Sequence, residues 1–147
     1  MKDLKNILVG VDFNKKTEQL LEKAQNLAKH YNAKLWLLHV ATPLPEYVGF
    51  ESTTHYTVAD RENFVSEEKD KIAAYAQKIK EAGVEAKGLL LEGATIDVIL
   101  EEANLLNVDL IVCGHEEHNL LYNMFFGSIS SALVRRSKIP VLVYPLD

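Results

Sequence analysis

The segment ILVGVD, residues 7–12, is a continuous apolar run that stops at an aspartate. A strand covered on both faces has this pattern, whereas a strand with one wet face alternates apolar and polar residues. Similar apolar runs occupy residues 35–40 and 108–113, and shorter or more polar runs occupy 84–91 and 141–144. Five such strands separated by longer segments predict a parallel sheet with helices on both faces.

Four helices are expected between these strands, over residues 15–31, 59–82, 95–106 and 128–136. Gly83 stands where the left-handed residue that ends a helix is expected. The expected buried stripe of the second helix consists of Phe64, Ile72, Tyr75, Ala76 and Ile79. Residues 43–57 lack periodicity and contain two prolines and a glycine, which predicts a long loop.

The predicted strand order is 3-2-1-4-5, because the first, second and fourth strands are the most apolar and belong in the centre. Right-handed crossovers leave few other arrangements. The chain is therefore expected to form one domain, residues 1–147, with a three-layer α/β sandwich. In such sheets ligands bind at the carboxyl ends of the strands where the winding reverses. This predicts a site built from Gly10, Val11 and Asp12 and from the residues that follow Cys113.

Composition narrows the class of protein. The 147 residues are 48% apolar and 25% charged, an ordinary globular balance. The net charge of -5 argues against non-specific binding to nucleic acid or to anionic membranes, and no stretch approaches the roughly 20 apolar residues of a membrane span. Cys113 is the only cysteine, so an internal disulfide is excluded and a reducing cytoplasm is favoured.

Three residues after the fourth strand are suited to an anion. Gly114 would let the backbone approach a phosphate, and Gly127 with Ser128 opens the last helix, where N–H groups and the helix dipole attract negative charge. The alternative is that Gly114 only turns the chain and Ser128 only caps the helix. The P-loop, the dinucleotide-binding Gly-x-Gly-x-x-Gly and the hydrolase Gly-x-Ser-x-Gly motifs are absent.

These residues resemble the universal stress protein family over essentially the whole chain. The resemblance is carried by ILVGVDF at 7–13, LHV at 38–40, the EGATI segment at 92–96, VDLIVCG at 108–114 and GSISSALVRRSKIPVLVYP at 127–145. It implies a Rossmann-like fold of the adenine nucleotide alpha hydrolase type. It also implies a stress-response regulator that forms a homodimer through the last strand, residues 141–144.

The ATP-binding branch of that family has a Gly-x2-Gly-x9-Gly-Ser/Thr loop around the phosphates. By resemblance, Gly114, Gly127 and Ser128 match this loop, and Asp12 and Val40 lie near the adenosine. The residues expected at an ATP or AMP molecule, with magnesium as a companion ion, are Gly10, Val11, Asp12, Val40, Cys113, Gly114, Glu117, Gly127, Ser128 and Ile129.

Glu117 departs from this loop, because it replaces the second glycine. A carboxylate about 4 Å from a phosphate charge costs ~1 kcal/mol in water and ~4 kcal/mol near a protein surface. That cost lowers affinity by roughly tenfold to a thousandfold. Two hypotheses follow: a nucleotide-sensing homodimer, and a dimerisation module whose pocket Glu117 disables. No general base is identifiable, so at most slow ATP hydrolysis is expected and no enzyme class is assigned.

Several polar residues near the predicted crevice have two interpretations. His115 and His118 could bind a metal, but a solvated loop is favoured because no third ligand is evident. His39 could contact a ligand or be a satisfied residue at the end of its strand. Cys113 is read as a buried small side chain rather than a reactive thiol. Ser128, Ser130 and Ser131 could accept a phosphate, although surface serines of a helix explain them as well.

Overall fold

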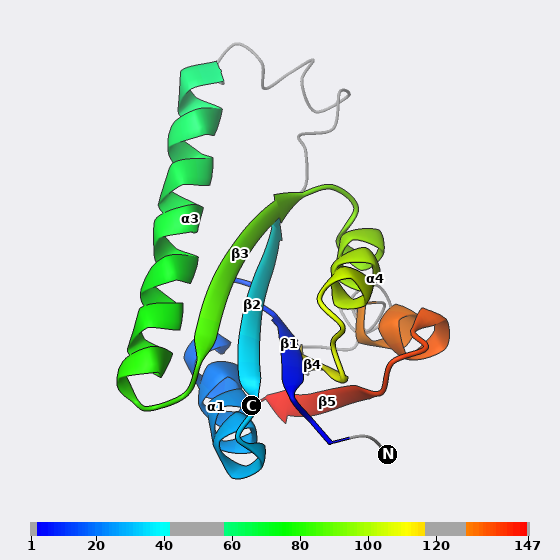
Figure 1. Ribbon diagram of the computed structural model, residues 1–147. Coiled ribbons are helices and arrows are strands. Elements are labelled where there is room, and N and C mark those ends of the chain that lie inside the picture. Colours follow the sequence, from blue (N-terminus) through cyan, green and yellow to red (C-terminus); the bar gives the residue numbers. More distant parts are fainter. Residues whose placement is uncertain (1–2, 42–57, 117–128, 147) are drawn as a thin grey trace.

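The computed structural model describes residues 3–41, 58–116 and 129–146, in which strands and helices alternate along the chain (Figure 1). The strands are β1 (Asn6–Gly10), β2 (Lys34–Ala41), β3 (Ala86–Glu92), β4 (Leu110–Glu116) and β5 (Val141–Leu146). The helices are α1 (Thr17–Tyr31), α3 (Val58–Glu81), α4 (Thr95–Leu105) and a further helix over residues 129–136. The predicted loop at 43–57 lies outside the described residues.

The five strands form one parallel sheet in the order β3-β2-β1-β4-β5, which confirms the predicted order. β1 occupies the centre, where Val9 pairs with Leu37 of β2 and with Val112 of β4. The winding direction reverses between β1 and β4, so the carboxyl ends of these two strands flank the topological switch point.

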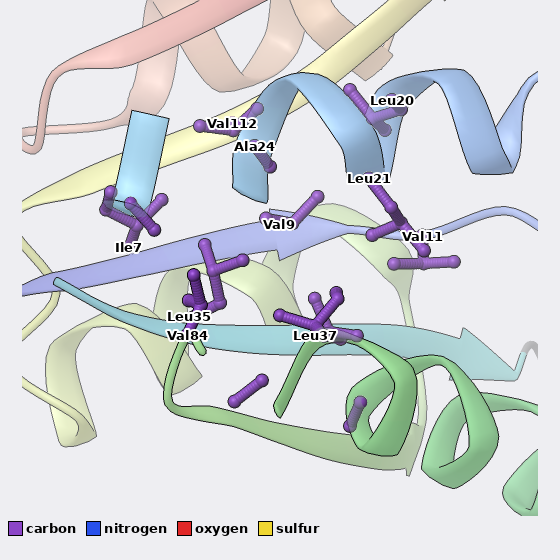
Figure 2. Close-up of a cluster of buried hydrophobic side chains, with 14 of the residues drawn as sticks. Ile7, Val9, Val11, Leu20, Leu21, Ala24, Leu35, Leu37, Val84 and Val112 are labelled. Atoms are coloured by element: carbon purple, nitrogen blue, oxygen red, sulfur yellow. The ribbon is translucent and has the colours of Figure 1, made fainter. Parts of the chain in front are cut away.

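Two helical layers cover the sheet, α1 and α3 on one face and α4 with the 129–136 helix on the other (Figure 1). Each face has its own hydrophobic core. Figure 2 shows the core beneath α1 and α3, in which Ile7, Val9, Leu35 and Leu37 are fully buried. Leu8, one residue from both Ile7 and Val9, belongs to the opposite core, as the two-residue period of a strand requires.

α3 corrects one prediction about the buried stripe. Ile72, Ala76 and Ile79 are buried, but Phe64 is 58% exposed. The 24-residue helix spans about 36 Å, whereas the seven-residue strand β3 spans about 23 Å. Figure 1 shows that the amino-terminal part of α3 extends past the end of β3, so the predicted stripe is not covered by this strand along the whole helix. Gly83 follows the helix with φ of 95°, as predicted for the residue that ends it.

Asp109 fixes the edge of the sheet opposite the predicted crevice. Its Oδ2 atom accepts hydrogen bonds from the backbone N–H groups of Lys5 and Asn6, at 2.9 and 3.0 Å. The sequence predicts Asp109 inside the fourth strand, but β4 begins at Leu110. The N–H of Asp109 still donates to the carbonyl oxygen of Asn6 at 2.8 Å, so bonding to β1 begins one residue before the strand. Among the described residues, no helix is long and apolar enough to cross a bilayer.

Candidate functional site: the crevice between β1 and β4

A cavity of about 280 Å³ lies at the carboxyl ends of β1, β2 and β4. Its apolar walls are formed by Val11, Leu20, Leu38, Val40, Ile99, Cys113, Leu133 and Leu146. Its polar lining comes from Asp12, Asn14, Lys16, Thr17, Thr95, His115 and Ser130. An apolar pocket with a few polar groups on its lining is the usual composition of a small-molecule site.

The exit of β1 forms the wall that carries Asp12. Although β1 ends at Gly10, the N–H of Val11 still donates to the carbonyl oxygen of Leu38 at 2.8 Å, so the pairing with β2 continues for one residue. The carbonyl oxygen of Asp12 then accepts bonds from the N–H of Asn14, at 2.9 Å, and from the Thr17 hydroxyl. These bonds fix the Asp12 backbone, while its side chain is exposed at the cavity.

The turn between β1 and α1 is closed by side chains. The Oδ1 atom of Asn14 accepts a bond from the N–H of Lys16 at 2.8 Å, and the Thr17 hydroxyl accepts one from the N–H of Asn14 at 3.0 Å. Asn and Thr commonly close turns in this way. The turn brings Asn14, Lys16 and Thr17 to the same cavity as Asp12.

The wall contributed by β4 contains Cys113, Gly114 and His115. Gly114 was expected just after the fourth strand, but it lies within β4, because β5 pairs with β4 as far as Glu116. A Cβ atom at Gly114 would come within 2.5 Å of Cδ1 of the buried Leu146. The lack of a side chain at Gly114 therefore gives Leu146 room at the cavity.

Burial also determines the chemistry of Cys113. Desolvation raises the pKa of its thiol to about 11, so the group is a neutral thiol at pH 7. A neutral thiol is a weak nucleophile and a poor metal ligand. The interpretation of Cys113 as a small apolar wall residue fits this environment.

Three helices begin at the cavity, as the βα connections of the fold require. Lys16 and Thr17 mark the start of α1, Thr95 starts α4, and Ile129 with Ser130 opens the described part of the 129–136 helix. Helix starts present the positive end of the helix dipole, although at α1 the N–H groups of Lys16 and Thr17 are already bonded to Asn14. Lys16 adds a formal positive charge, and within the described ranges no carboxylate forms an ion pair with it. The cavity is therefore suited to an anionic group.

Seven of the ten residues predicted at the site line this cavity. They are Gly10, Val11, Asp12, Val40, Cys113, Gly114 and Ile129. The other three, Glu117, Gly127 and Ser128, lie outside the described residues, as does His118. Within the described part of the chain, no group of three His, Cys, Asp or Glu side chains is arranged to hold a metal ion.

The prediction missed the polar lining residues Asn14, Lys16, Thr17 and Thr95. The first three lie within five residues after Asp12, in the turn between β1 and α1. Because such βα turns face the ligand in parallel sheets, topology alone could have predicted them. Thr95 could not be predicted in this way, because it starts the helix that follows β3, and β3 lies at the edge of the sheet rather than beside the switch point. The helix crosses back over the sheet, which brings Ile99 to 3.8 Å from the position of a Cβ on Gly10 and Thr95 to the cavity.

Comparison with known proteins shows the class to which the chain belongs. A model of the universal stress protein family matches residues 3–145. Universal stress protein YxiE of Bacillus subtilis strain 168 is 30% identical over 142 residues, which cover 93% of this chain and 96% of YxiE. This chain belongs to the universal stress protein family, as its sequence motifs predicted.

Solved structures of the family have the same fold. A universal stress protein in complex with cAMP matches with a TM-score of 0.67 and 22% identity, over 97% of this chain and 98% of that chain. The universal stress protein from Archaeoglobus fulgidus in complex with dAMP matches with a TM-score of 0.66 and 19% identity, over 99% of this chain and all of that chain. At these identities the likeness confirms the Rossmann-like α/β fold.

Proposed function

We propose that this protein is a nucleotide-responsive regulator of the stress response that binds ATP or AMP in the crevice between β1 and β4. The observation that carries the proposal is the cavity, where an exposed carboxylate, apolar walls and three helix starts meet at the switch point of the sheet. Two solved proteins of the same fold are complexes with adenine nucleotides, cAMP and dAMP, which supports the same ligand class here.

The two kinds of lining suggest how a nucleotide would lie. The carboxylate of Asp12 can accept hydrogen bonds from ribose hydroxyls or from the adenine amino group. The apolar Leu38, Val40 and Ile99 provide the surface that a purine base needs. The phosphates then point toward Lys16 and the start of the 129–136 helix, where Gly127 and Ser128 are expected to contribute. Magnesium would neutralise part of the charge when the ligand is ATP.

We also propose a homodimer formed through β5. In the described sheet β5 lies at one edge, and Val141, Leu142, Val143 and Tyr144 are only partly buried. An edge strand offers unpaired backbone groups to another strand. Sedimentation analysis should give twice the chain mass, whereas a monomer at micromolar concentration would refute this part of the proposal.

Calorimetric titration with ATP and AMP, each with and without magnesium, tests the nucleotide proposal. Asp12→Ala removes the exposed carboxylate, and Asp3→Ala removes an exposed carboxylate outside the cavity lining as a matched control. We expect micromolar binding that Asp12→Ala weakens by about tenfold, the loss of one charge-assisted hydrogen bond. Absence of binding to every ligand would refute the proposal.

A further inference from the structure

His39 and Glu68 form a buried pair behind the wall of the crevice. The His39 Nε2 atom lies 2.6 Å from the Glu68 Oε2 atom, and the two side chains are only 12% and 10% exposed. Successive residues of a strand face opposite sides of a sheet, so Leu38 and Val40 line the cavity while His39 points toward the α1 and α3 layer. Glu68 reaches His39 from α3.

The hydrogen bonds of His39 determine where its protons are. The Nδ1 atom lies 2.7 Å from the carbonyl oxygen of Val11. A carbonyl oxygen can only accept, so Nδ1 carries a hydrogen and donates it. If Glu68 and Nε2 both lacked a proton, two lone pairs would face each other across 2.6 Å. One proton must therefore lie between Nε2 and the Glu68 carboxyl group, and it joins the pair by a hydrogen bond.

This pair acts on the backbone beside Asp12. Val11 is bound on both sides, through its N–H to Leu38 and through its carbonyl to the His39 ring. Phe13, on the other side of Asp12, has its ring centroid 4.4 Å from that of His39 and 6.4 Å from that of Tyr75 on α3. Both neighbours of Asp12 thus contact the His39 ring, and Glu68 binds the other nitrogen of that ring.

We propose that His39 and Glu68 are positioning residues that hold Asp12 at the crevice and so set its affinity for an adenine nucleotide. The affinity part rests on the proposed function, whereas the positioning part does not. Because Glu68 belongs to α3, displacing this helix would loosen the bond between His39 and the Val11 carbonyl and lower nucleotide affinity. Nucleotide binding would in turn favour the docked position of α3 by the same factor.

Variants of Glu68 separate positioning from simple stability. Glu68→Leu removes the partner of Nε2. Glu68→Gln keeps it, because the amide can donate to Nε2 of a neutral ring that still donates from Nδ1 to Val11. Glu67→Leu makes the same change at an exposed neighbour, and Ile72→Val removes a methyl group from the buried face of the same helix while the His39–Glu68 pair stays in place.

The test combines nucleotide titration with amide hydrogen exchange of the unliganded protein. In Glu68→Leu we expect AMP affinity to fall by about tenfold, the equivalent of one lost hydrogen bond. We also expect exchange of the Val11 amide, protected by Leu38, to rise by about tenfold beyond any change shared by the core strands. Glu68→Gln should restore both to within about threefold of the wild type. Glu67→Leu should leave both unchanged, and Ile72→Val should change Val11 exchange only as much as it changes exchange of the other core strands.

Two results overturn the inference. The first is an increase in Val11 amide exchange that is no larger in Glu68→Leu than in Ile72→Val. The other is a Glu68→Leu protein that binds AMP as tightly as the wild type. If the wild type binds no nucleotide at all, the proposed function fails. The exchange rate of the Val11 amide in Glu68→Leu then tests by itself whether the His39–Glu68 pair positions the backbone beside Asp12.

Discussion

The hydroxyl of Thr17 donates to the carbonyl oxygen of Asp12, which ties the first residue of α1 to the end of β1. The same hydroxyl accepts from the N–H of Asn14 at 3.0 Å, and Thr17 is only 2% exposed. One buried hydroxyl therefore satisfies a donor and an acceptor of the turn that carries the exposed carboxylate into the crevice.

Thr17→Val should lower the free energy of unfolding by about 1–3 kcal/mol, because the shape is kept but the Asp12 carbonyl loses a bond in a buried place. Thr17→Ser, which keeps the hydroxyl, is the matched control and should lose less. Urea denaturation measures both. Equal stability of the valine variant and the wild type would show that the hydroxyl does not hold the turn.

Lys16 should bind the phosphates of a nucleotide rather than its adenosine. Lys16→Ala is expected to weaken ATP binding by about five- to tenfold, the scale of a partly solvent-exposed charge pair, and to leave adenosine binding unchanged. Lys15→Ala is the control, because Lys15 is exposed and does not line the cavity. Added salt should weaken ATP binding more in the wild type than in Lys16→Ala. Equal losses for ATP and adenosine would contradict this role.

Glu117→Gly restores the glycine of the phosphate loop that the family resemblance implies. If the carboxylate faces the phosphates, the variant should bind ATP at least about tenfold more tightly, because a like-charge contact is removed. AMP, with fewer phosphate charges, should gain less. Titration of both ligands decides the point, and unchanged ATP affinity would refute the repulsion.

Alkaline pH should destabilise the fold through Cys113. Burial raises the pKa of its thiol from 9.0 to about 11, so between these values the unfolded chain releases a proton that the folded chain keeps. Stability that is fully present below pH 9 is therefore lost as the pH rises toward 11, by up to about 3 kcal/mol. Cys113→Ala should show a shallower fall over this range in denaturation measured at each pH. If the free energy of unfolding falls with pH equally in the wild type and in Cys113→Ala, ionisation of Cys113 does not contribute.

The fold was predictable because its determinants are local and repeated. Continuous apolar strands such as ILVGV at 7–11 specify burial on both faces, and the alternation of strands and helices then restricts the strand order. Phe64 was placed wrongly because a helical stripe does not reveal where the neighbouring strand ends. The polarity of Asp109 likewise did not show that its side chain bonds to Lys5 and Asn6, over one hundred residues away.

The site was predictable only where it follows the strand ends. Asp12 and Gly114 could be assigned from topology, whereas Thr95 reaches the cavity through the path of α4 across the sheet. His39 was left between two interpretations, and its bonds to Val11 and Glu68 favour the satisfied residue at a strand end. Its partner Glu68 could not be predicted, because one glutamate among several acidic residues of the same helix is normally expected to be exposed to solvent.

Titration of ¹⁵N-labelled protein with AMP tests whether an adenine nucleotide occupies the crevice between β1 and β4. A nucleotide in this crevice should shift the backbone amide resonances of Asp12, Gly114 and Ser130 together, and the shifts should saturate with one dissociation constant. Amides at the opposite edge of the sheet, such as those of Lys34 and Asp109, should stay in place. Shifts centred on that opposite edge, or none at saturating AMP, would contradict the account.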